Sequence, residues 1–233
     1  RYQIRVWVIF LISICLIFVH NPVFSQGLTA RVYIDPNQSS AVTCGTHQIT
    51  VNVEDVENLT AYHLEISFDP TVVEVLDIEN GAFLSEPADV AYFYEPTNEI
   101  DNENGKVIFG MAQQGVEDNP LVVPQSGSGS LIVITLQALV PNDSTLFVID
   151  DVASHMVEWP SVLPIEFTTT DGEVSTESCA PTDIALSNAT IPENEPANTL
   201  VGNFAATDAD TGDALVYTLV DTITYPDNAL VTI

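Results

Sequence analysis

The stretch of the sequence that most constrains the fold is a run of alternating residues between Tyr62 and Phe68. Every second side chain in this run is apolar, and the side chains between them are polar. A period of two is typical of a β-strand that buries one face and turns the other to solvent. Asp69-Pro70 ends the run, because proline cannot donate a hydrogen bond to a neighbouring strand. The valine-rich stretch from Val72 to Ile78 then predicts a new strand.

The rest of the sequence shows the same kind of pattern. No stretch has a sustained helical period, so the chain is predicted to be all-β, and strands without intervening helices pack as a sandwich or a barrel. Asn104-Gly105 is a two-residue hairpin signal. Nine strands are expected, at Thr29–Ile34, Thr46–Val53, Ala61–Phe68, Val72–Ile78, Val90–Glu95, Lys106–Ala112, Gly129–Val140, Thr145–Val152 and Pro164–Thr170.

The N-terminal segment has the composition of a secretion signal. Arg1 and Arg5 precede an almost unbroken apolar run from Val6 to Val19, and Val23-Phe24-Ser25 offers positions for a signal peptidase. The apolar run is shorter than the about 20 residues that span a bilayer. We therefore expect residues 1–25 to be a signal peptide, and the protein to be secreted or held at the cell surface. Membrane contact is expected only through this signal or through an anchor beyond residue 233.

The charge of the chain excludes one class of partner. Aspartate and glutamate total 33 against 4 lysines and arginines, which gives a net charge of −29. Nucleic acid is not an expected partner, because phosphate binding requires clustered basic residues. Calcium, a basic partner or a salt-rich habitat would suit such a surface, and plain solubility is an equally good explanation. The acidic run from Asp101 to Asn104 could touch a cation, but a solvated turn is favoured.

The sequence offers no motif for catalysis. Acidic residues are so abundant that pairs such as Glu65 and Glu74 arise by chance, and no Cys/His spacing typical of a metal site occurs. The glycine-rich stretch from Ser126 to Ser130 has no following lysine, so it is not a phosphate-binding loop. We therefore expect a protein that is not an enzyme.

Three segments in a fixed order carry a resemblance to a known family. These are VNVEDVENLTAYHLEISFDPTVVEVLDIENGAF, NGKVIFGMAQQG and GSGSLIVITLQAL. With their valine-rich strand, their Asp-Pro strand end and their Gly-Lys strand, they resemble a cohesin domain. The resemblance covers roughly Leu28 to Ser175. It implies that residues 28–175 fold as a nine-stranded jelly-roll β-sandwich.

The resemblance also implies a partner and a binding face. Cohesins bind a dockerin, a small calcium-loaded helical domain of another protein, through the outer face of their third, fifth, sixth and eighth strands. His63, Glu65 and Ser67 would lie on that face. Tyr92 and Tyr94 share one side of the fifth strand, where they would be either aromatic anchors for a partner or core residues. An exposed tyrosine pair could also stack on sugar rings, so polysaccharide binding is the second functional hypothesis.

The same resemblance implies a pairing for two of the three cysteines. Cys15 lies in the expected signal peptide, which leaves Cys44 and Cys179. In cohesins the first and last strands pair in parallel, so the end of the last strand would lie near the start of the second. A Cys44–Cys179 disulfide is therefore expected, and two unpaired thiols are the alternative.

The composition changes after the cohesin-like region. Thr176 to Pro181 is short, polar and ends in proline, as linkers do. Residues 182–233 then resemble the first half of a cadherin repeat, on the Ile191–Asn194 and Thr199–Gly202 motifs and an Asp-Ala-Asp motif. A truncated second β-sandwich, giving calcium-dependent adhesion or a stalk, is the implied structure.

The cadherin-like motifs imply calcium ligands. Glu193, Asp208 and Asp210 match the family's ligand positions, and calcium favours carboxylate oxygens. The preceding linker lacks the family's acidic run, so calcium is expected as a cofactor of a longer protein rather than of this stretch alone. The alternative is that Asp208 and Asp210 form an ordinary turn.

Overall fold

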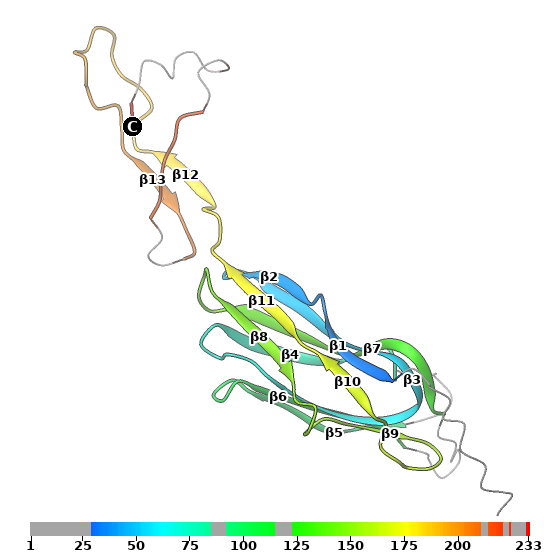
Figure 1. Ribbon diagram of the computed structural model, residues 1–233. Coiled ribbons are helices and arrows are strands. Elements are labelled where there is room, and N and C mark those ends of the chain that lie inside the picture. The colour runs from blue at the N-terminus through cyan, green and yellow to red at the C-terminus, as the bar shows by residue number, and fades with distance from the viewer. Residues whose placement is uncertain (1–28, 85–91, 115–122, 211–213, 221–223, 225–231) are drawn as a thin grey trace, which may run out of the picture.

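The computed structural model describes residues 29–84, 92–114, 123–210, 214–220, 224 and 232–233, and this part of the chain is all-β. The expected signal peptide lies outside these residues. Among them, no helix is long and apolar enough to cross a membrane. The first eleven strands form one unit, and the last two form a second unit at one end of it (Figure 1).

The strands of the first unit lie close to the expected positions, with three additions. They are β1 (Ala30–Asp35), β2 (Gln38–Val42), β3 (Thr46–Ser67), β4 (Val73–Asn80), β5 (Tyr92–Asp101), β6 (Lys106–Gln114), β7 (Gln125–Ala138), β8 (Ser144–Ile149), β9 (His155–Glu158), β10 (Phe167–Thr170) and β11 (Gly172–Glu177). The second unit contains β12 (Asp183–Leu186) and β13 (Phe204–Thr207).

Strand β3 belongs to both layers of a sandwich. Its first half pairs antiparallel with β1 and β7, and its second half, from Leu59 to Ser67, pairs with β6, β8 and β9. Between the halves, Asp55 and Asn58 have positive φ angles of 55° and 56°. Aspartate and asparagine tolerate this left-handed conformation better than most residues, so the chain can turn from one layer to the other.

The two layers follow from this division of β3. One layer has the order β4-β7-β3-β1-β10, and the other has the order β5-β6-β3-β8-β11-β2. The expected parallel pairing of the first and last strands is confirmed by β1 with β10, and a second parallel pair joins β2 to β11 in the other layer. Thr176 and Glu177, the first residues of the expected linker, belong to this second pair.

The count of nine strands was wrong for two physical reasons. The expected strands at Thr46–Val53 and Ala61–Phe68 are one strand with a corner, because β3 keeps its ladder across the turn. Strands β2, β9 and β11 were missed, because they are short or polar and take their stability from neighbours far away in the sequence. The all-β sandwich itself was predicted correctly.

The core fills the space between the two layers. Tyr62, Leu64, Ile66 and Phe68 are all buried, as the period of two predicted. They belong to one core cluster with buried residues of eight other strands, among them Val32, Val75, Phe109, Ile134, Phe147 and Val174. The Tyr62 hydroxyl donates a 2.7 Å hydrogen bond to the carbonyl oxygen of Leu131, so its polar end is satisfied.

The described part of the second unit does not show the expected sandwich. Within the described residues it consists of one antiparallel pair, β12 with β13, and not of two packed layers. A two-stranded sheet cannot cover its own apolar side chains. Ile184, Leu200 and Val216 accordingly remain exposed.

One side chain covers the free edge of β4. Asn102 accepts a hydrogen bond from the backbone N–H of Val75 and donates one to the carbonyl oxygen of the same residue, both at 2.9 Å.

The turn that holds Asn102 is longer than the two-residue hairpin expected from Asn104-Gly105. The carboxylate of Asp101 organises it by accepting the N–H groups of Glu103 and Asn104. This acidic run therefore has a structural role.

We expect Asn102→Ala to lower the free energy of unfolding by about 1–3 kcal/mol, because it leaves the two backbone groups of the buried residue Val75 without their partner. Urea denaturation measures this change. Glu103→Ala in the same turn is the control, and it should change stability by less than about 0.5 kcal/mol. Equal effects of the two substitutions would contradict the role of Asn102.

Candidate functional site

Four adjacent strand positions of one layer, the last of them shared by two short strands, build a solvent-facing surface. We call the outer side of β5, β6, the second half of β3, and β8 with β9 the four-strand face. Strands β8 and β9 pair with β3 one after the other, at Ile66 and at Tyr62. Because alternate residues of β3 are buried, His63, Glu65 and Ser67 point to this outer side. The strands that the resemblance implied for partner binding are thus neighbours in one layer.

A charged pair lies at the centre of the four-strand face. Lys106, the only lysine in the chain, contacts the Glu65 carboxylate through its ammonium group. His63 Nε2 lies 3.5 Å from the other oxygen of the same carboxylate. The side chain of Glu65 is 19% exposed and that of Lys106 is 41% exposed. The carboxylate is therefore better shielded from water than the ammonium group.

These contacts shift the protonation equilibria of both partners. The hydrogen bond from Lys106 lowers the pKa of Glu65, partial burial opposes this, and the hydrogen bond with His63 lowers the pKa further. The same hydrogen bond raises the pKa of Lys106, and the charges of Glu65, Asp150 and Glu99 add to the effect. The ion pair is therefore maintained over a wide pH range.

A second histidine extends the polar centre of the face. His155 on β9 is paired directly with His63 on β3, and the two rings are stacked with centroids 6.5 Å apart. Sequence reasoning missed both His155 and Lys106 as members of this surface. The sequence does single out Lys106 as the only lysine in the chain, but its position next to β3 depends on the fold.

The loop between β8 and β9 fixes the backbone of Glu65. The N–H of Asp150 donates to the carbonyl oxygen of Glu65 at 3.0 Å, and the N–H of Glu65 donates to the buried hydroxyl of Ser154 at 3.0 Å. The Asp150 carboxylate accepts the N–H groups of Val152 and Ala153, which lowers its pKa. Both the backbone and the side chain of Glu65 are thus held in place.

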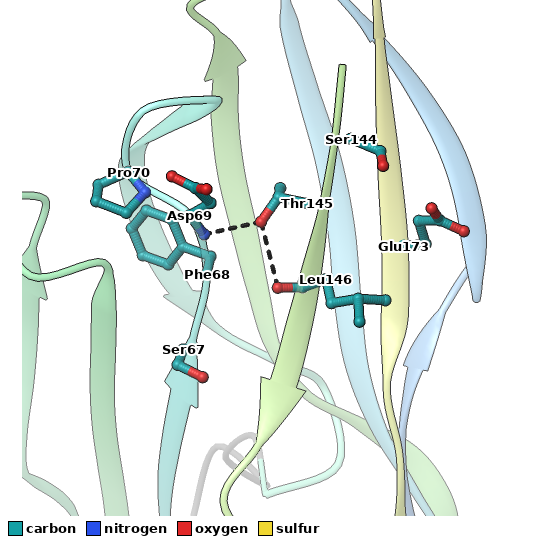
Figure 2. Close-up of a pocket in the computed structure, with 8 residues that line it drawn as sticks. All are labelled: Ser67, Phe68, Asp69, Pro70, Ser144, Thr145, Leu146 and Glu173. Carbon is teal, nitrogen blue, oxygen red and sulfur yellow. Dashed lines mark hydrogen bonds between the residues drawn. The ribbon is translucent and has the colours of Figure 1, made fainter.

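A shallow hollow lies at one end of the face (Figure 2). Strands β3 and β8 separate beyond Ser67, and the Thr145 hydroxyl bridges the gap by accepting the N–H of Asp69 at 2.8 Å. The residues around the hollow are Ser67, Phe68, Asp69, Pro70, Ser144, Thr145, Leu146 and Glu173. Leu146 is 56% exposed here, so it offers an apolar contact at this end of the face.

The structure places only the backbone of the expected tyrosine pair. Tyr92 and Tyr94 lie on β5, opposite Gln114 and Ala112 of β6. Ala112 is in turn opposite Ala61, two residues before His63 on β3. The positions of the two tyrosine side chains lie outside the described part of the chain, so their role stays a prediction.

Cys44 and Cys179 form a disulfide bond. Their Cα atoms are 5.9 Å apart, and 135 positions separate them in the sequence. The parallel pair β2 and β11 brings them together, because Val42 is paired with Glu177 and each cysteine lies two residues further on. The bond therefore closes the end of the sandwich at which the second unit begins.

The three expected calcium ligands do not form a cluster. Asp208 accepts the N–H of Asp210 at 3.0 Å, which is a local turn, and Glu193 is exposed on a different loop. The Asp210 carboxylate accepts hydrogen bonds from the Thr43 hydroxyl and the Cys179 N–H. In the described part of the chain, no group of three or more histidine, cysteine, aspartate or glutamate side chains is arranged to hold a metal ion. The residues present therefore do not fit a calcium site by themselves.

The comparison with protein families identifies the fold. Residues 39–176, more than half of the chain, match the family model of the cohesin domain. The chain therefore belongs to the cohesin family. A comparison with curated proteins gave no match.

Solved structures with a similar fold are also cohesins. A type II cohesin domain from the cellulosome of Acetivibrio cellulolyticus has a TM-score of 0.52 and 14% sequence identity, over 63% of this chain and 95% of that chain. The third cohesin of ScaC from the same organism, in complex with the ScaB dockerin, has a TM-score of 0.50 and 16% identity, over 64% of this chain and 99% of that chain. At these identities the likeness shows a shared fold.

We expect removal of the disulfide in a Cys44→Ala/Cys179→Ala variant to lower the free energy of unfolding by about 2–5 kcal/mol, because the bond closes a long loop in the unfolded chain. Urea denaturation measures the loss. A thiol titration of the unreduced, denatured chain provides the control, and a free thiol at Cys44 or Cys179 would contradict the bond.

The lowered pKa of Glu65 predicts acid sensitivity. In the folded state this carboxylate binds its proton only at lower pH than in the unfolded state, so its stabilising contribution is present above about pH 4.3 and is lost as the pH falls further. Glu65→Gln should therefore lose less stability than the unmodified chain between about pH 5.5 and about pH 3. Thermal unfolding at both pH values measures the difference.

The Glu65→Gln variant must be compared with the unmodified chain, because other carboxylates also make the protein less stable in acid. Asp69, Asp101 and Asp150 also have lowered pKa values, so both proteins will be less stable in acid. Identical losses in Glu65→Gln and in the unmodified chain would show that Glu65 contributes nothing.

Proposed function

We propose that this chain is a non-catalytic docking module that binds a dockerin-type protein domain through its four-strand face. Membership of the cohesin family supports this, and a cohesin with the same fold is known in complex with a dockerin. The observation that carries the proposal is the arrangement of the face, in which Leu146 is exposed on β8 of the same layer that holds the fixed pair of Glu65 and Lys106. An apolar contact surrounded by ordered polar groups is typical of a protein interface.

Each part of the face has a separate task in this proposal. Leu146 supplies apolar area that the partner removes from water. Glu65 and Lys106 set the orientation of the partner, because a held ion pair presents charges of known sign at fixed positions. His63, Ser67 and the positions of Tyr92 and Tyr94 extend the same contact.

The proposal includes the setting in which the module acts. Residues 1–25 would direct export, and the protein would be secreted or held at the cell surface. Residues 182–233 would begin a cadherin-like repeat that carries the docking module away from a surface, with calcium bound only in a longer protein. The disulfide supports the extracellular setting, because such bonds persist mainly in oxidising compartments.

Polysaccharide binding is the second candidate function. Tyr92 and Tyr94 are two positions apart in the sequence, so the period of a strand would place them on a common side of β5. Two aromatic rings on one side of a strand could stack on sugar rings. This alternative uses the same layer of the sandwich, so one binding experiment separates the two functions.

The experiment measures binding of the purified chain to a panel of dockerin domains and to a panel of polysaccharides, by calorimetry with and without calcium. We expect binding to a dockerin and none to the polysaccharides. Leu146→Asp should weaken dockerin binding at least about tenfold, because it places a charge in the apolar contact.

Leu76→Asp is the matched control. Leu76 is also exposed, at 42%, but it lies on β4 in the opposite layer. It should leave the affinity within about twofold of the original value. Equal losses in both variants would contradict the four-strand face as the docking site. Glycan binding that Tyr92→Ala abolishes would replace the proposal by the carbohydrate function.

A further inference from the structure

The disulfide end of the sandwich carries two hydrogen-bond donors that face the same carboxylate. The Thr43 hydroxyl donates to Oδ1 of Asp210, and the backbone N–H of Cys179 donates to Oδ2 at 2.5 Å. The donors follow β2 and β11, whereas Asp210 follows β13 of the second unit. The carboxylate therefore connects two parts of the chain that have no strand in common.

Two features hold the donors in position. Thr43 is next to Cys44 in the sequence, so the disulfide fixes it beside Cys179, and its hydroxyl lies 3.6 Å from the Cys179 sulfur. The N–H of Thr43 also donates to the carbonyl oxygen of Glu177 at 3.1 Å, which extends the pairing of β2 and β11. Cys179 is buried, so water competes little for its N–H group.

The acceptor is held in position as well. The N–H of Asp210 donates to Oδ1 of Asp208, which forms a turn directly after β13. Strand β13 is paired with β12, and the N–H of Thr182 donates to the carbonyl oxygen of Thr207 at 2.9 Å. The turn therefore stays close to the short segment between Cys179 and β12.

We propose that Thr43 and Cys179 form a carboxylate-binding cradle at the disulfide end of the sandwich, and that its ligand is Asp210 of the second unit. The two charge-assisted hydrogen bonds fix the orientation of the second unit relative to the docking module. This role is independent of the four-strand face and of a dockerin partner. It also requires no cation, because hydrogen-bond donors of the chain itself stabilise the charged carboxylate.

The cradle changes the meaning of the Asp-Ala-Asp motif in this chain. Sequence reasoning assigned Asp210 to calcium, but both of its oxygens already accept hydrogen bonds from the sandwich. A calcium ion at Asp210 would have to share these two oxygens with the donors. The junction is therefore expected to be ordered in the absence of calcium.

Amide hydrogen exchange of Cys179, followed by NMR in the full chain, tests the proposal directly. Asp210→Ala should accelerate exchange of this amide at least about tenfold, because the N–H loses its charged acceptor. Relaxation of ¹⁵N nuclei should show that the two units tumble together in the unmodified chain and separately in the variant. Thr43→Val, which removes the other donor, should also accelerate exchange, by a smaller factor.

Asp183→Ala is the matched control, because Asp183 is an exposed carboxylate of the same unit. It should leave exchange at Cys179 unchanged. Unchanged exchange in Asp210→Ala would overturn the cradle. Loss of protection in the unmodified chain on addition of a calcium chelator would overturn it too, because the junction would then depend on a cation.

Discussion

The structure depends on the ability of one strand, β3, to change layers without ending. Its first half is an inner strand of one layer, and its second half is an inner strand of the other. The corner at Asp55 and Asn58 requires left-handed backbone conformations, which short polar side chains accept at low cost. Because β3 is hydrogen-bonded on both edges in both layers, displacement of this strand would break ladders in both layers at once.

The position of the candidate site follows from this strand. Glu65 lies in the second half of β3, where β6 is on one side and the loop between β8 and β9 is on the other. The Lys106 ammonium group holds its side chain, and Asp150 and Ser154 hold its backbone. In a chain with a net charge of −29, the only lysine is thus placed beside a fixed acid in the middle of a solvent-facing sheet. Such an arrangement gives the surface a defined pattern of charge rather than a uniform negative field.

The end of the sandwich has a second ordered contact. The parallel pair of β2 and β11 brings Cys44 and Cys179 together, and the bond between them fixes Thr43. The disulfide closes the end of the sandwich, and it also positions Thr43, which donates to Asp210 of the second unit. It therefore affects both the stability of the sandwich and the geometry of the junction. The four-strand face and the junction lie on different strands, so a change at one need not alter the other.

The sequence alone determined the local features of this protein. The period of two between Tyr62 and Phe68 identified which side chains of β3 are buried, and it correctly turned His63, Glu65 and Ser67 outward. These predictions succeeded because side-chain alternation is a property of the strand itself and needs no knowledge of its neighbours. The ordered motifs also led to the cohesin family, to which the chain belongs.

The tertiary structure alone decided the features that depend on pairing between distant segments. Lys106 and His155 reach Glu65 and His63 through the register of β6 and β9 with β3, which no short stretch of sequence encodes. The polar strands β2 and β11 are stabilised by distant neighbours, because β11 pairs with β8 and β2 pairs with β11. Asp210 looked like a calcium ligand because its motif is local, whereas its hydrogen bonds come from residues 31 and 167 positions away. Residue type limited what each side chain could do, and the neighbours that the fold supplied decided which of those roles it has.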